Sequence, residues 1–232
     1  MPDFELLSEL KIELNEKARE RLSAYHALLI KNNERMDLTN VPEEEMTLRH
    51  YADSLMVLNA GLIPENAHLI DVGTGAGFPG LPLAIAREDI KVTLLESKQK
   101  RCAFLQEVID ALELKNARVI CGRAEDLAAG ANREMYDIAA ARAVASLSTL
   151  AEYLLPYVRV GGKALCWKGP AVKEELQIGQ KAAKLLGGKL GNLVDLGLPG
   201  RSSYVQIIKK FSETPKKYPR KAGTPASKPL GT

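Results

Sequence analysis

A glycine-rich segment between residues 71 and 80 carries residue types that suit the binding of nucleotide-like ligands. It reads Asp71-Val72-Gly73-Thr74-Gly75-Ala76-Gly77 and follows the short apolar run at 68–70. Glycines at alternating positions let the backbone approach a ligand closely and adopt positive φ angles at little conformational cost. Because glycine loops of this kind occur in several nucleotide-binding folds, the glycines alone predict only such a ligand at a strand-to-helix turn.

Three carboxylates near this loop narrow the choice of ligand. Asp71 precedes the first glycine by two residues, and the loop has the spacing Gly-x-Gly-x-Gly in place of the Gly-x-Gly-x-x-Gly of nicotinamide-binding proteins. A carboxylate there suits a cationic ligand, such as a sulfonium that carries an amino-acid group. Glu96 is placed to accept hydrogen bonds from ribose hydroxyls, and Glu125 is placed to meet an adenine amino group. Each alone could be a solvated loop residue, but three at successive strand ends predict S-adenosylmethionine as the ligand.

The segments that must position these residues alternate between strand-like and helix-like patterns. Strands are predicted at 68–72, 92–96, 117–121, 136–140, 162–167, 189–196 and 203–209, and helices between them at 81–87, 98–112, 147–155 and 172–186. This alternation predicts an α/β fold with a mostly parallel sheet that is covered by helices on both faces. The gap at 197–202 is too short for a helical crossover, so we expect the last two strands to form an antiparallel hairpin at the sheet edge.

Two further segments flank this α/β region. Apolar residues recur at three- and four-residue steps over 3–32, which predicts one long helix, and Pro42 opens a second helical stretch at 43–59. The tail after the last strand has no periodic pattern. We therefore expect an N-terminal helical extension at 1–65, a ligand-binding domain at 66–211 and a basic C-terminal tail at 212–232.

Composition excludes several classes of protein. Apolar residues make up 46% and charged residues 26% of the chain, which is ordinary for a globular protein, and neither a signal peptide nor a membrane-spanning run is recognised. Cys102, Cys121 and Cys166 are widely spaced, so we expect reduced thiols in a cytoplasmic protein, without disulfides or a zinc site. The three histidines lack metal-ligand spacing, and no metal is expected. His50 and Asp53 lie one helical turn apart and are expected to pair structurally.

Charge is distributed unevenly along the chain. Residues 1–66 hold 7 lysines and arginines against 13 acidic residues, whereas 209–232 hold 7 against 1. A basic terminal segment predicts a polyanionic partner such as nucleic acid, and a solvated, disordered tail explains the charge equally well. If the partner is RNA, Tyr218 can stack on an unpaired base. The basic residues of the candidate RNA-binding surface are Arg201, Lys209, Lys210, Lys216, Lys217, Arg220 and Lys221.

The residues after the glycines resemble those of one known family. The segment 71–85, with Phe78-Pro79-Gly80-Leu81-Pro82 after the glycines, is similar to motif I of the bacterial small-subunit rRNA guanine-N7 methyltransferases, also called glucose-inhibited division protein B. The resemblance covers the whole chain, although Thr74 and Ala76 stand where the family pattern has Ser and Gly. Further matching segments are Asn33–Asn40, Arg49–Leu55, Arg123–Asp126, Ala141-Arg142-Ala143, Trp167-Lys168-Gly169 and Lys217–Pro225.

This resemblance implies a class I methyltransferase (Rossmann-like) fold, with a mostly parallel seven-stranded sheet, an antiparallel edge hairpin and an N-terminal helical extension. The implied substrate is one guanine of 16S rRNA near the decoding centre, in free rRNA or in a 30S ribosomal particle. We expect a monomer that uses S-adenosylmethionine, without a metal or a membrane. Together with the position of Asp71, the resemblance predicts cofactor contacts at Asp71, Gly73, Gly75, Phe78, Glu96, Ala124, Glu125 and Arg142.

The implied chemistry requires few catalytic groups. Guanine N7 has an in-plane lone pair and no proton, so direct in-line transfer needs neither a general base nor a covalent intermediate and depends on alignment. The sequence also lacks the Asn/Asp-Pro-Pro-Tyr run of amino-group methyltransferases and the Pro-Cys or Thr-Cys nucleophile of cytosine-C5 enzymes. Arg142 follows the fourth predicted strand, where its donors can hold the cofactor or orient guanine O6. Lys168 follows the fifth and can contact a phosphate or the base. A helix cap or ion pair at Arg142 and a plain surface lysine at Lys168 are the alternatives.

Three other interpretations stay open. A small molecule or a protein side chain could accept the methyl group on the same fold, although the basic tail favours RNA. A nicotinamide-dependent oxidoreductase would need the other glycine spacing and a catalytic Tyr/Lys or His pair, neither of which is found. A non-catalytic RNA-binding protein with a relic cofactor pocket is disfavoured by the intact carboxylates at three strand ends, and only an assay distinguishes it.

Overall fold

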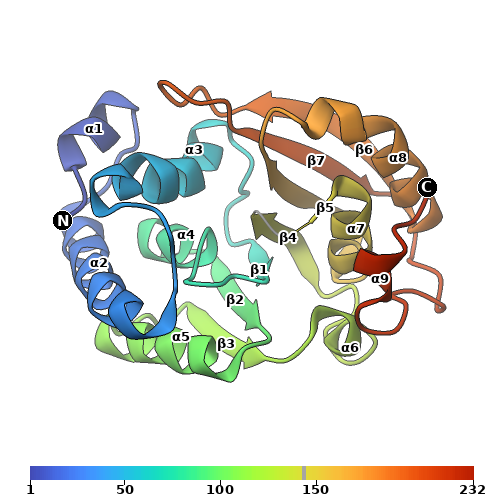
Figure 1. The fold of residues 1–232 in the computed structure, drawn as a ribbon, viewed down its shortest axis with the longest axis horizontal. Helices are drawn as coiled ribbons and strands as arrows, with labels where there is room; N and C mark the ends of the chain where they lie inside the picture. The colour runs from blue at the N-terminus through green and yellow to red at the C-terminus, as the bar shows by residue number, and fades with distance from the viewer. Residues whose placement is uncertain (143–144) are drawn as a thin grey trace.

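A seven-stranded mixed sheet forms the centre of the protein, as a computed structural model shows for residues 1–142 and 145–232 (Figure 1). The strands follow the order β3-β2-β1-β4-β5-β7-β6, and all pair in parallel except β7, which is antiparallel to both neighbours. Ala143, which belongs to one of the resemblance motifs, lies outside the described residues. The strands are β1 (His68–Val72), β2 (Lys91–Glu96), β3 (Ala117–Cys121), β4 (Tyr136–Arg142), β5 (Val158–Lys168), β6 (Gly188–Asp195) and β7 (Tyr204–Lys210).

Helices cover both faces of this sheet, as predicted. The segments α4 and α5 pack on one face with the N-terminal helices outside them, and α7 and α8 pack on the other (Figure 1). The antiparallel hairpin is also confirmed, with β6 at the edge and β7 inside it. The helices are α1 (Phe4–Glu9), α2 (Glu16–Met36), the 3₁₀-helix η1 (Glu43–Glu45), the π-helix η2 (Thr47–Ala52), α3 (Asp53–Asn59), α4 (Gly80–Ala86), α5 (Gln99–Ala111), α6 (Ala124–Leu127), α7 (Leu147–Leu154), α8 (Val172–Leu185) and α9 (Thr224–Ser227).

The strand order reverses between β1 and β4, and this reversal fixes where a ligand can bind. The chain runs outward from β1 to β2 and β3, then returns to the other side of β1 as β4. Asp71 pairs in register with Ala140, so the end of β1 lies beside the end of β4. Diverging connections at such a point leave a crevice at the carboxyl ends of the strands.

The N-terminal segment does not form the single helix that was predicted over 3–32. Helices α1 and α2 are separated by residues 10–15, where Lys11 has a φ of 59°. The side chain of Asn15 accepts a hydrogen bond from the Ala18 N–H at 2.8 Å and so caps α2. Because Asn competes with the helix for backbone donors, it favours a new helix start over a continuous helix.

The N-terminal helices and the C-terminal tail both pack onto the sheet domain. Leu22 and Tyr25 of α2 belong to the same hydrophobic cluster as Leu94 of β2. The tail at 212–232 lies along α7 and α8, and Tyr218 and Leu230 pack into the cluster on that face. The basic tail is therefore ordered in this structure, in contrast to the solvated, disordered alternative.

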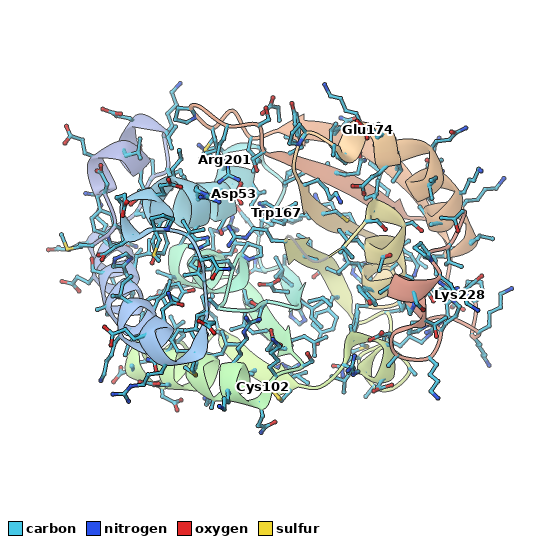
Figure 2. The ribbon with its side chains drawn as sticks, viewed as in Figure 1. Asp53, Cys102, Trp167, Glu174, Arg201 and Lys228 are labelled. Carbon is cyan, nitrogen blue, oxygen red and sulfur yellow. A yellow bond between two sulfur atoms is a disulfide. The ribbon has the colours of Figure 1, made fainter. Side chains whose placement is uncertain are left out.

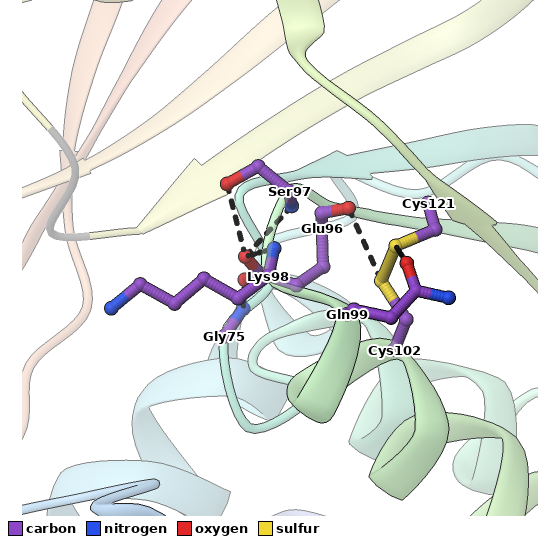
Figure 3. Close-up of a disulfide and its surroundings, with 7 residues drawn as sticks. All are labelled: Gly75, Glu96, Ser97, Lys98, Gln99, Cys102 and Cys121. Atoms are coloured by element: carbon purple, nitrogen blue, oxygen red, sulfur yellow. Dashed lines mark hydrogen bonds between the residues drawn. A yellow bond between two sulfur atoms is a disulfide. The ribbon is translucent and has the colours of Figure 1, made fainter.

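The expectation of three reduced thiols is wrong for two of the cysteines. Cys102 in α5 and Cys121 at the end of β3 form a disulfide, with their Cα atoms 5.9 Å apart (Figure 3). The two cysteines are 19 residues apart, so their spacing gave no sign of a contact. They meet because α5 packs against β3, which pairs with β2. Cys166 is a buried free cysteine. The inference from reduced thiols to a cytoplasmic location therefore does not hold.

No helix within residues 1–142 and 145–232 is long and apolar enough to cross a membrane. No group of three or more His, Cys, Asp or Glu side chains is arranged there to hold a metal ion.

Candidate active site

The glycine loop leaves β1 at its carboxyl end and turns into α4. The N–H groups of Gly73 and Thr74 donate to the Leu95 carbonyl at 2.8 and 3.1 Å, which holds the loop against the end of β2. Gly77 has a φ of 110°, and a Cβ atom there would lie 2.3 Å from Leu81 Cδ1. Only glycine meets both requirements at this position.

Asp71 is completely buried beneath the loop. Its Oδ2 accepts hydrogen bonds from the Thr74 hydroxyl at 2.6 Å and from the Gly80 N–H at 2.8 Å, whereas its Oδ1 has no hydrogen-bond partner in the described part of the chain. Burial raises the pKa of this carboxyl to about 6, although the two hydrogen bonds oppose the shift. Asp71 therefore shapes the loop from below, and its predicted contact with a ligand is at most electrostatic.

Glu96 ends β2 and binds the glycine loop from the side (Figure 3). Its Oε2 accepts a hydrogen bond from the Gly75 N–H at 3.0 Å, and its Oε1 accepts from the N–H groups of Ser97 and Lys98 at 2.7 and 2.9 Å. A carboxylate oxygen has two lone-pair directions, so Glu96 can accept further hydrogen bonds from a ligand. The position agrees with the one predicted for a ribose-binding carboxylate.

A cavity of about 140 Å³ opens between the carboxyl ends of β1, β2 and β3. Glu125 in α6 lines it with one carboxylate oxygen held, since Oε1 accepts a hydrogen bond from the Gly223 N–H at 2.8 Å. Apolar walls, one aromatic ring and a carboxylate fit an adenosine group. The lining residues are Val72, Gly73, Leu95, Ser97, Gly122, Arg123, Ala124, Glu125 and Tyr153.

A larger cavity lies elsewhere, at the opposite edge of the sheet. It measures about 540 Å³ and is lined by the first residues of several strands, among them His68, Lys91 and Ala117. Open α/β sheets bind ligands at the carboxyl ends of their strands. Because the glycine loop, Glu96 and Glu125 all lie at that carboxyl edge, the smaller cavity is the candidate ligand site.

Arg142, the last residue of β4, is the centre of a polar network that joins the sheet to the N-terminal helices. Its guanidinium group donates to the Arg49 carbonyl at 2.9 Å, to Asp53 Oδ2 at 3.1 Å and to His50 Nδ1 at 3.0 Å. The same group lies 4.9 Å above the ring of Phe78. An arginine has five N–H donors, so these contacts leave others for a ligand.

His50 is held in this network as a neutral imidazole. Since arginine only donates, Nδ1 accepts from Arg142, and the network assigns the proton to Nε2, which lies 2.7 Å from the Thr39 hydroxyl oxygen. Burial, and then the charge of Arg142, lowers the pKa of His50 to about 3. Its ring stacks on Phe78 with the centroids 4.4 Å apart. Neither ring nitrogen therefore offers a lone pair to a substrate.

The segment η2 explains why His50 and Asp53 converge on Arg142. The π-helix Thr47–Ala52 ends where α3 begins, and π-turns are frequent at functional sites because they redirect neighbouring side chains. The expected pairing of His50 with Asp53 is not formed between these two described residues, because both bind Arg142 instead. Asp53 also accepts a hydrogen bond from the Ser203 hydroxyl at Oδ1. Their helical spacing was the only sequence signal for this role.

The carboxyl edge of the sheet holds a second cavity besides the one lined by Glu125. This second cavity measures about 230 Å³ and opens beside Arg142 at the ends of β4 and β5. Asp53, Trp167 and Arg201 lie together at this end of the molecule (Figure 2). Basic side chains outnumber acidic ones on its walls, so the cavity favours an electron-rich or anionic group. The lining residues are Val41, Arg49, His50, Asp53, Arg142, Trp167, Lys168, Gly169, Arg201 and Ser203.

Two other predicted site residues have protein partners. Lys168 lines the second cavity, but its Nζ pairs with Glu175 Oε1 at 2.8 Å and donates to the Ala145 carbonyl at 3.0 Å. Phe78 is 4% exposed and packs between Tyr25, His50 and Arg142. Its side chain supports Arg142, so a contact with the cofactor would have to come from its backbone.

The predicted RNA-binding residues do not form one surface. Arg201, in the β6–β7 hairpin, borders the second cavity, whereas Lys209 lies near the other end of β7, at the opposite edge of the sheet. Lys216, Lys217 and Lys221 are exposed on the tail.

Three further members of the predicted RNA surface are occupied inside the protein. Lys210 is buried, and its Nζ donates to the Leu155 carbonyl at 2.7 Å. Arg220 forms an ion pair with Glu152 at 2.6 Å. Tyr218 is 7% exposed, so the predicted stacking of its ring on a base does not fit the structure. Sequence spacing could not reveal the two contacts because Leu155 and Glu152 are distant along the chain from Lys210 and Arg220.

Comparisons with known proteins find matches in sequence and in structure. A family model described as rRNA small subunit methyltransferase G matches residues 18–204. The chain is 46% identical over 229 residues to the ribosomal RNA small subunit methyltransferase G of Leuconostoc citreum, which covers 97% of this chain and 96% of the relative. It is 44% identical over 226 residues to the protein of the same name from Alkaliphilus metalliredigens, covering 96% and 95% of the two chains.

Solved structures with low sequence identity share the fold. A SAM-dependent methyltransferase from Aquifex aeolicus superposes with a TM-score of 0.53 at 19% identity, covering 71% of this chain and 92% of the other. The TYW2 protein of P. horikoshii in complex with MeSAdo superposes with a TM-score of 0.54 at 17% identity, covering 67% and 61%. At these identities the likeness concerns the arrangement of the sheet and its helices.

Proposed function

The chain belongs to the rRNA small subunit methyltransferase G family, and we propose that it transfers a methyl group in line from S-adenosylmethionine to N7 of one guanine in 16S rRNA near the decoding centre. The predicted family, the class I methyltransferase fold and the cofactor are confirmed. The observation that carries the finer proposal is a pair of cavities at the ends of neighbouring strands. One is lined by Glu125 beside the glycine loop, and the other is lined by Arg142 and further cations.

For the cofactor, we propose that Glu96 accepts hydrogen bonds from the ribose and Glu125 from the adenine amino group. Gly73, Gly75 and Ala124 would supply the backbone surface between them. When bound, S-adenosylmethionine supplies an electrophilic methyl group on a cationic sulfur. The unpartnered Oδ1 of Asp71 fits such a ligand, because a carboxyl with a pKa of about 6 is mostly ionised at pH 7 and creates a negative potential beneath the loop.

For the acceptor, we propose that an unpaired guanine enters the second cavity. Guanine presents N7 and O6 as neighbouring acceptors on one edge. N7 must keep its lone pair for the methyl group, so the free donors of Arg142 would bind O6 and orient the base. Trp167 lines the same cavity, and aromatic side chains commonly stack on unpaired bases.

The proposed transfer needs no nucleophile or base from the protein, and the chain's own groups agree with that. Both nitrogens of His50 are engaged in hydrogen bonds. Burial raises the pKa of the Cys166 thiol to about 12, which keeps it protonated, and Cys102 and Cys121 are bonded to each other. Catalysis would therefore depend on holding the base and the methyl group in line, without a covalent enzyme intermediate.

We also propose a division of labour along the chain. The helical extension at 1–65 would shape the guanine cavity, the domain at 66–211 would bind the cofactor, and the tail at 212–232 would bring Lys216, Lys217 and Lys221 to RNA phosphates. Arg201 would contact RNA beside the guanine cavity. Lys209 remains a proposed contact only for RNA that reaches the opposite edge of the sheet.

The direct test uses methyl-labelled S-adenosylmethionine with three acceptors: free 16S rRNA, assembled 30S particles and a small-molecule guanine nucleoside. The two RNA acceptors should come from cells that lack the modification. We expect N7-methylguanine at a single position of the rRNA, located by nuclease mapping and mass spectrometry. Methylation at another atom, or at many guanines, would contradict the proposed specificity.

A further inference from the structure

The tail runs along α7 (Figure 1), and it contacts Glu125, which lines the cavity proposed for the cofactor. The Thr149 hydroxyl donates to the Pro225 carbonyl at 3.1 Å, and the Ser148 hydroxyl donates to the Leu230 carbonyl. Both hydroxyls are on buried residues of α7. These contacts fix the backbone of the tail over the helix that follows β4.

Arg220 anchors this segment on a carboxylate that is fully buried. The Glu152 side chain has no exposed surface, and its Oε1 accepts hydrogen bonds from the backbone N–H and the Nε of Arg220 at 2.8 and 3.0 Å. A second guanidinium nitrogen donates to Oε2 at 2.6 Å. Since an uncompensated buried carboxylate is strongly unfavourable, Arg220 has one strongly preferred place in the structure.

Three residues further on, the tail meets the residue proposed to bind adenine. The Gly223 N–H donates to Glu125 Oε1 at 2.8 Å. Glu125 is 7% exposed, so its carboxylate depends on partners within the protein, and the terminal torsion of a glutamate is otherwise broad. With Oε1 held by Gly223, Oε2 takes a defined direction at the wall of the cavity.

Tyr153 connects the two contacts. It lines the cavity with Glu125, one residue after Glu152 on α7. Burial raises the pKa of its phenol, and the charges of Glu125 and Glu152 raise it further, as expected for a ring that lies near both carboxylates. The anchor and the proposed adenine contact are therefore close in space as well as in sequence.

We propose that the tail is a positioning element for the cofactor, in which the Arg220–Glu152 pair holds the Gly223 N–H on Glu125 so that this carboxylate selects the adenine amino group. This inference rests on the proposed placement of adenine beside Glu125. It gives Arg220 and Gly223 a role through Glu125, without contact to the cofactor. It also gives the tail a function in addition to the proposed contact with RNA.

Gly223→Ala is the sharpest variant for this proposal. Gly223 has a φ of 83°, and a Cβ atom there would meet nothing within 4 Å, so alanine adds backbone strain at the hydrogen bond without a clash. Gly61→Ala is the matched control, because Gly61 has a φ of 62° and equally open surroundings, at the turn that follows α3. Arg220→Lys keeps the charge but loses the fixed fork that spans both oxygens of Glu152.

The readout is the selection between S-adenosylmethionine and its N6-deaminated analogue, measured by calorimetric titration of the full chain and by the KM and kcat of methyl transfer. The wild type and Gly61→Ala should prefer the adenine form roughly 10-fold or more, the effect of one well-placed hydrogen bond to a charged group. In Gly223→Ala and Arg220→Lys this preference should fall several-fold, with a raised KM for the cofactor and nearly unchanged kcat at saturation.

Glu125→Gln separates failure of this inference from failure of the proposed site. A glutamine has an acceptor oxygen at one end and an NH2 donor at the other, so with its oxygen on the Gly223 N–H it turns a donor toward the adenine amino group and should lose the preference. If Glu125→Gln still prefers adenine, adenine binds elsewhere and the proposed placement fails. If Glu125→Gln loses the preference while Gly223→Ala and Arg220→Lys keep it, the placement stands and the positioning role of the tail is refuted. Should Arg220→Lys fail to fold in a thermal melt, Gly223→Ala decides the matter alone.

Discussion

The N-terminal helices and the C-terminal tail reach the same edge of the sheet but support different halves of the site. The N-terminal helices contribute side chains, because His50 and Asp53 bind the guanidinium of Arg142 beside the second cavity. The tail contributes a backbone N–H, because Gly223 binds Glu125 at the first cavity. Binding at the second cavity should therefore be sensitive to any single substitution in the buried charged network of Arg142. Binding at the first cavity should be sensitive mainly to substitutions of the residues that hold the tail in place.

The largest effect should come from the half that depends on side chains. Replacing Arg142 with alanine removes the proposed guanine donor and leaves Asp53 without its ion-pair partner, so we expect kcat/KM for rRNA to fall roughly 100- to 1,000-fold. Arg142→Lys should recover little, because an ammonium cannot reproduce three divergent contacts. Single-turnover assays with 30S particles would measure both. Activity near that of the wild type would remove Arg142 from the site.

The second prediction concerns the stability cost of the charge on Asp71, which is buried beneath the glycine loop. Because burial raises its pKa from 3.8 to about 6, folding favours the protonated carboxyl. Its contribution to stability is complete below pH 3.8 and is lost as the pH rises to about 6, by up to about 3 kcal/mol. Denaturant titrations between pH 3.5 and 7 should therefore show the wild type losing stability relative to Asp71→Asn as the pH rises. A constant difference would show that the carboxyl is not strongly shifted.

The tail lysines test whether RNA binding and cofactor binding can be separated. Neutralising Lys216, Lys217 and Lys221 should reduce the slope of log affinity against log salt by roughly 0.7–0.9 for each phosphate contact that is lost. Affinity for the cofactor should stay unchanged, because these side chains are exposed and do not line the cavity. Filter-binding titrations at several salt concentrations would measure the slope. Neutralising the three exposed lysines Lys173, Lys181 and Lys184 of α8 is the matched control and should leave the slope unaltered.

The smallest expected effect concerns His50, whose imidazole should show no change of charge between pH 5 and 8. Its pKa is lowered to about 3 by burial first and by Arg142 second, so its imidazole should keep the proton on Nε2 throughout pH 5–8. Nitrogen-15 NMR of the ring would report both the tautomer and the charge. In Arg142→Ala the pKa should rise, since one cause of its depression is gone. Titration of His50 near pH 6.5 in the wild type would contradict the hydrogen bonds of His50 with Arg142 and Thr39 beside the second cavity.

Local patterns were sufficient to predict the sheet and the positions of Glu96 and Glu125 at its carboxyl edge. The alternation of buried strands and amphipathic helices identified all seven strands to within a few residues, and β1 and β3 to the residue. Glu96 and Glu125 could be found because parallel strands place the residues at their carboxyl ends together. Position along the chain and position in space are closely related in such a fold.

The remaining features depend on contacts that no local pattern encodes. His50 and Arg142 are 92 residues apart, and Gly223 and Glu125 are 98 apart, so neither contact leaves a periodic signal. The disulfide between Cys102 and Cys121 has the same origin in tertiary structure. The break between α1 and α2 did have a local signal in Asn15, but the apolar spacing on both sides outweighed it.

The contact between Gly223 and Glu125 also orders the events of synthesis. All seven strands are made before the segment that holds Glu125, since Gly223 follows the end of β7 at Lys210. Domains begin to fold from their N-terminal parts while the chain is still growing. The contacts of Arg142 beside the second cavity can therefore form before Gly223 reaches Glu125. If the tail positions Glu125 as proposed, an emerging chain gains selective cofactor binding only after Gly223 has left the ribosome. A nascent chain would then discriminate less well than the finished protein between S-adenosylmethionine and analogues that lack the adenine amino group.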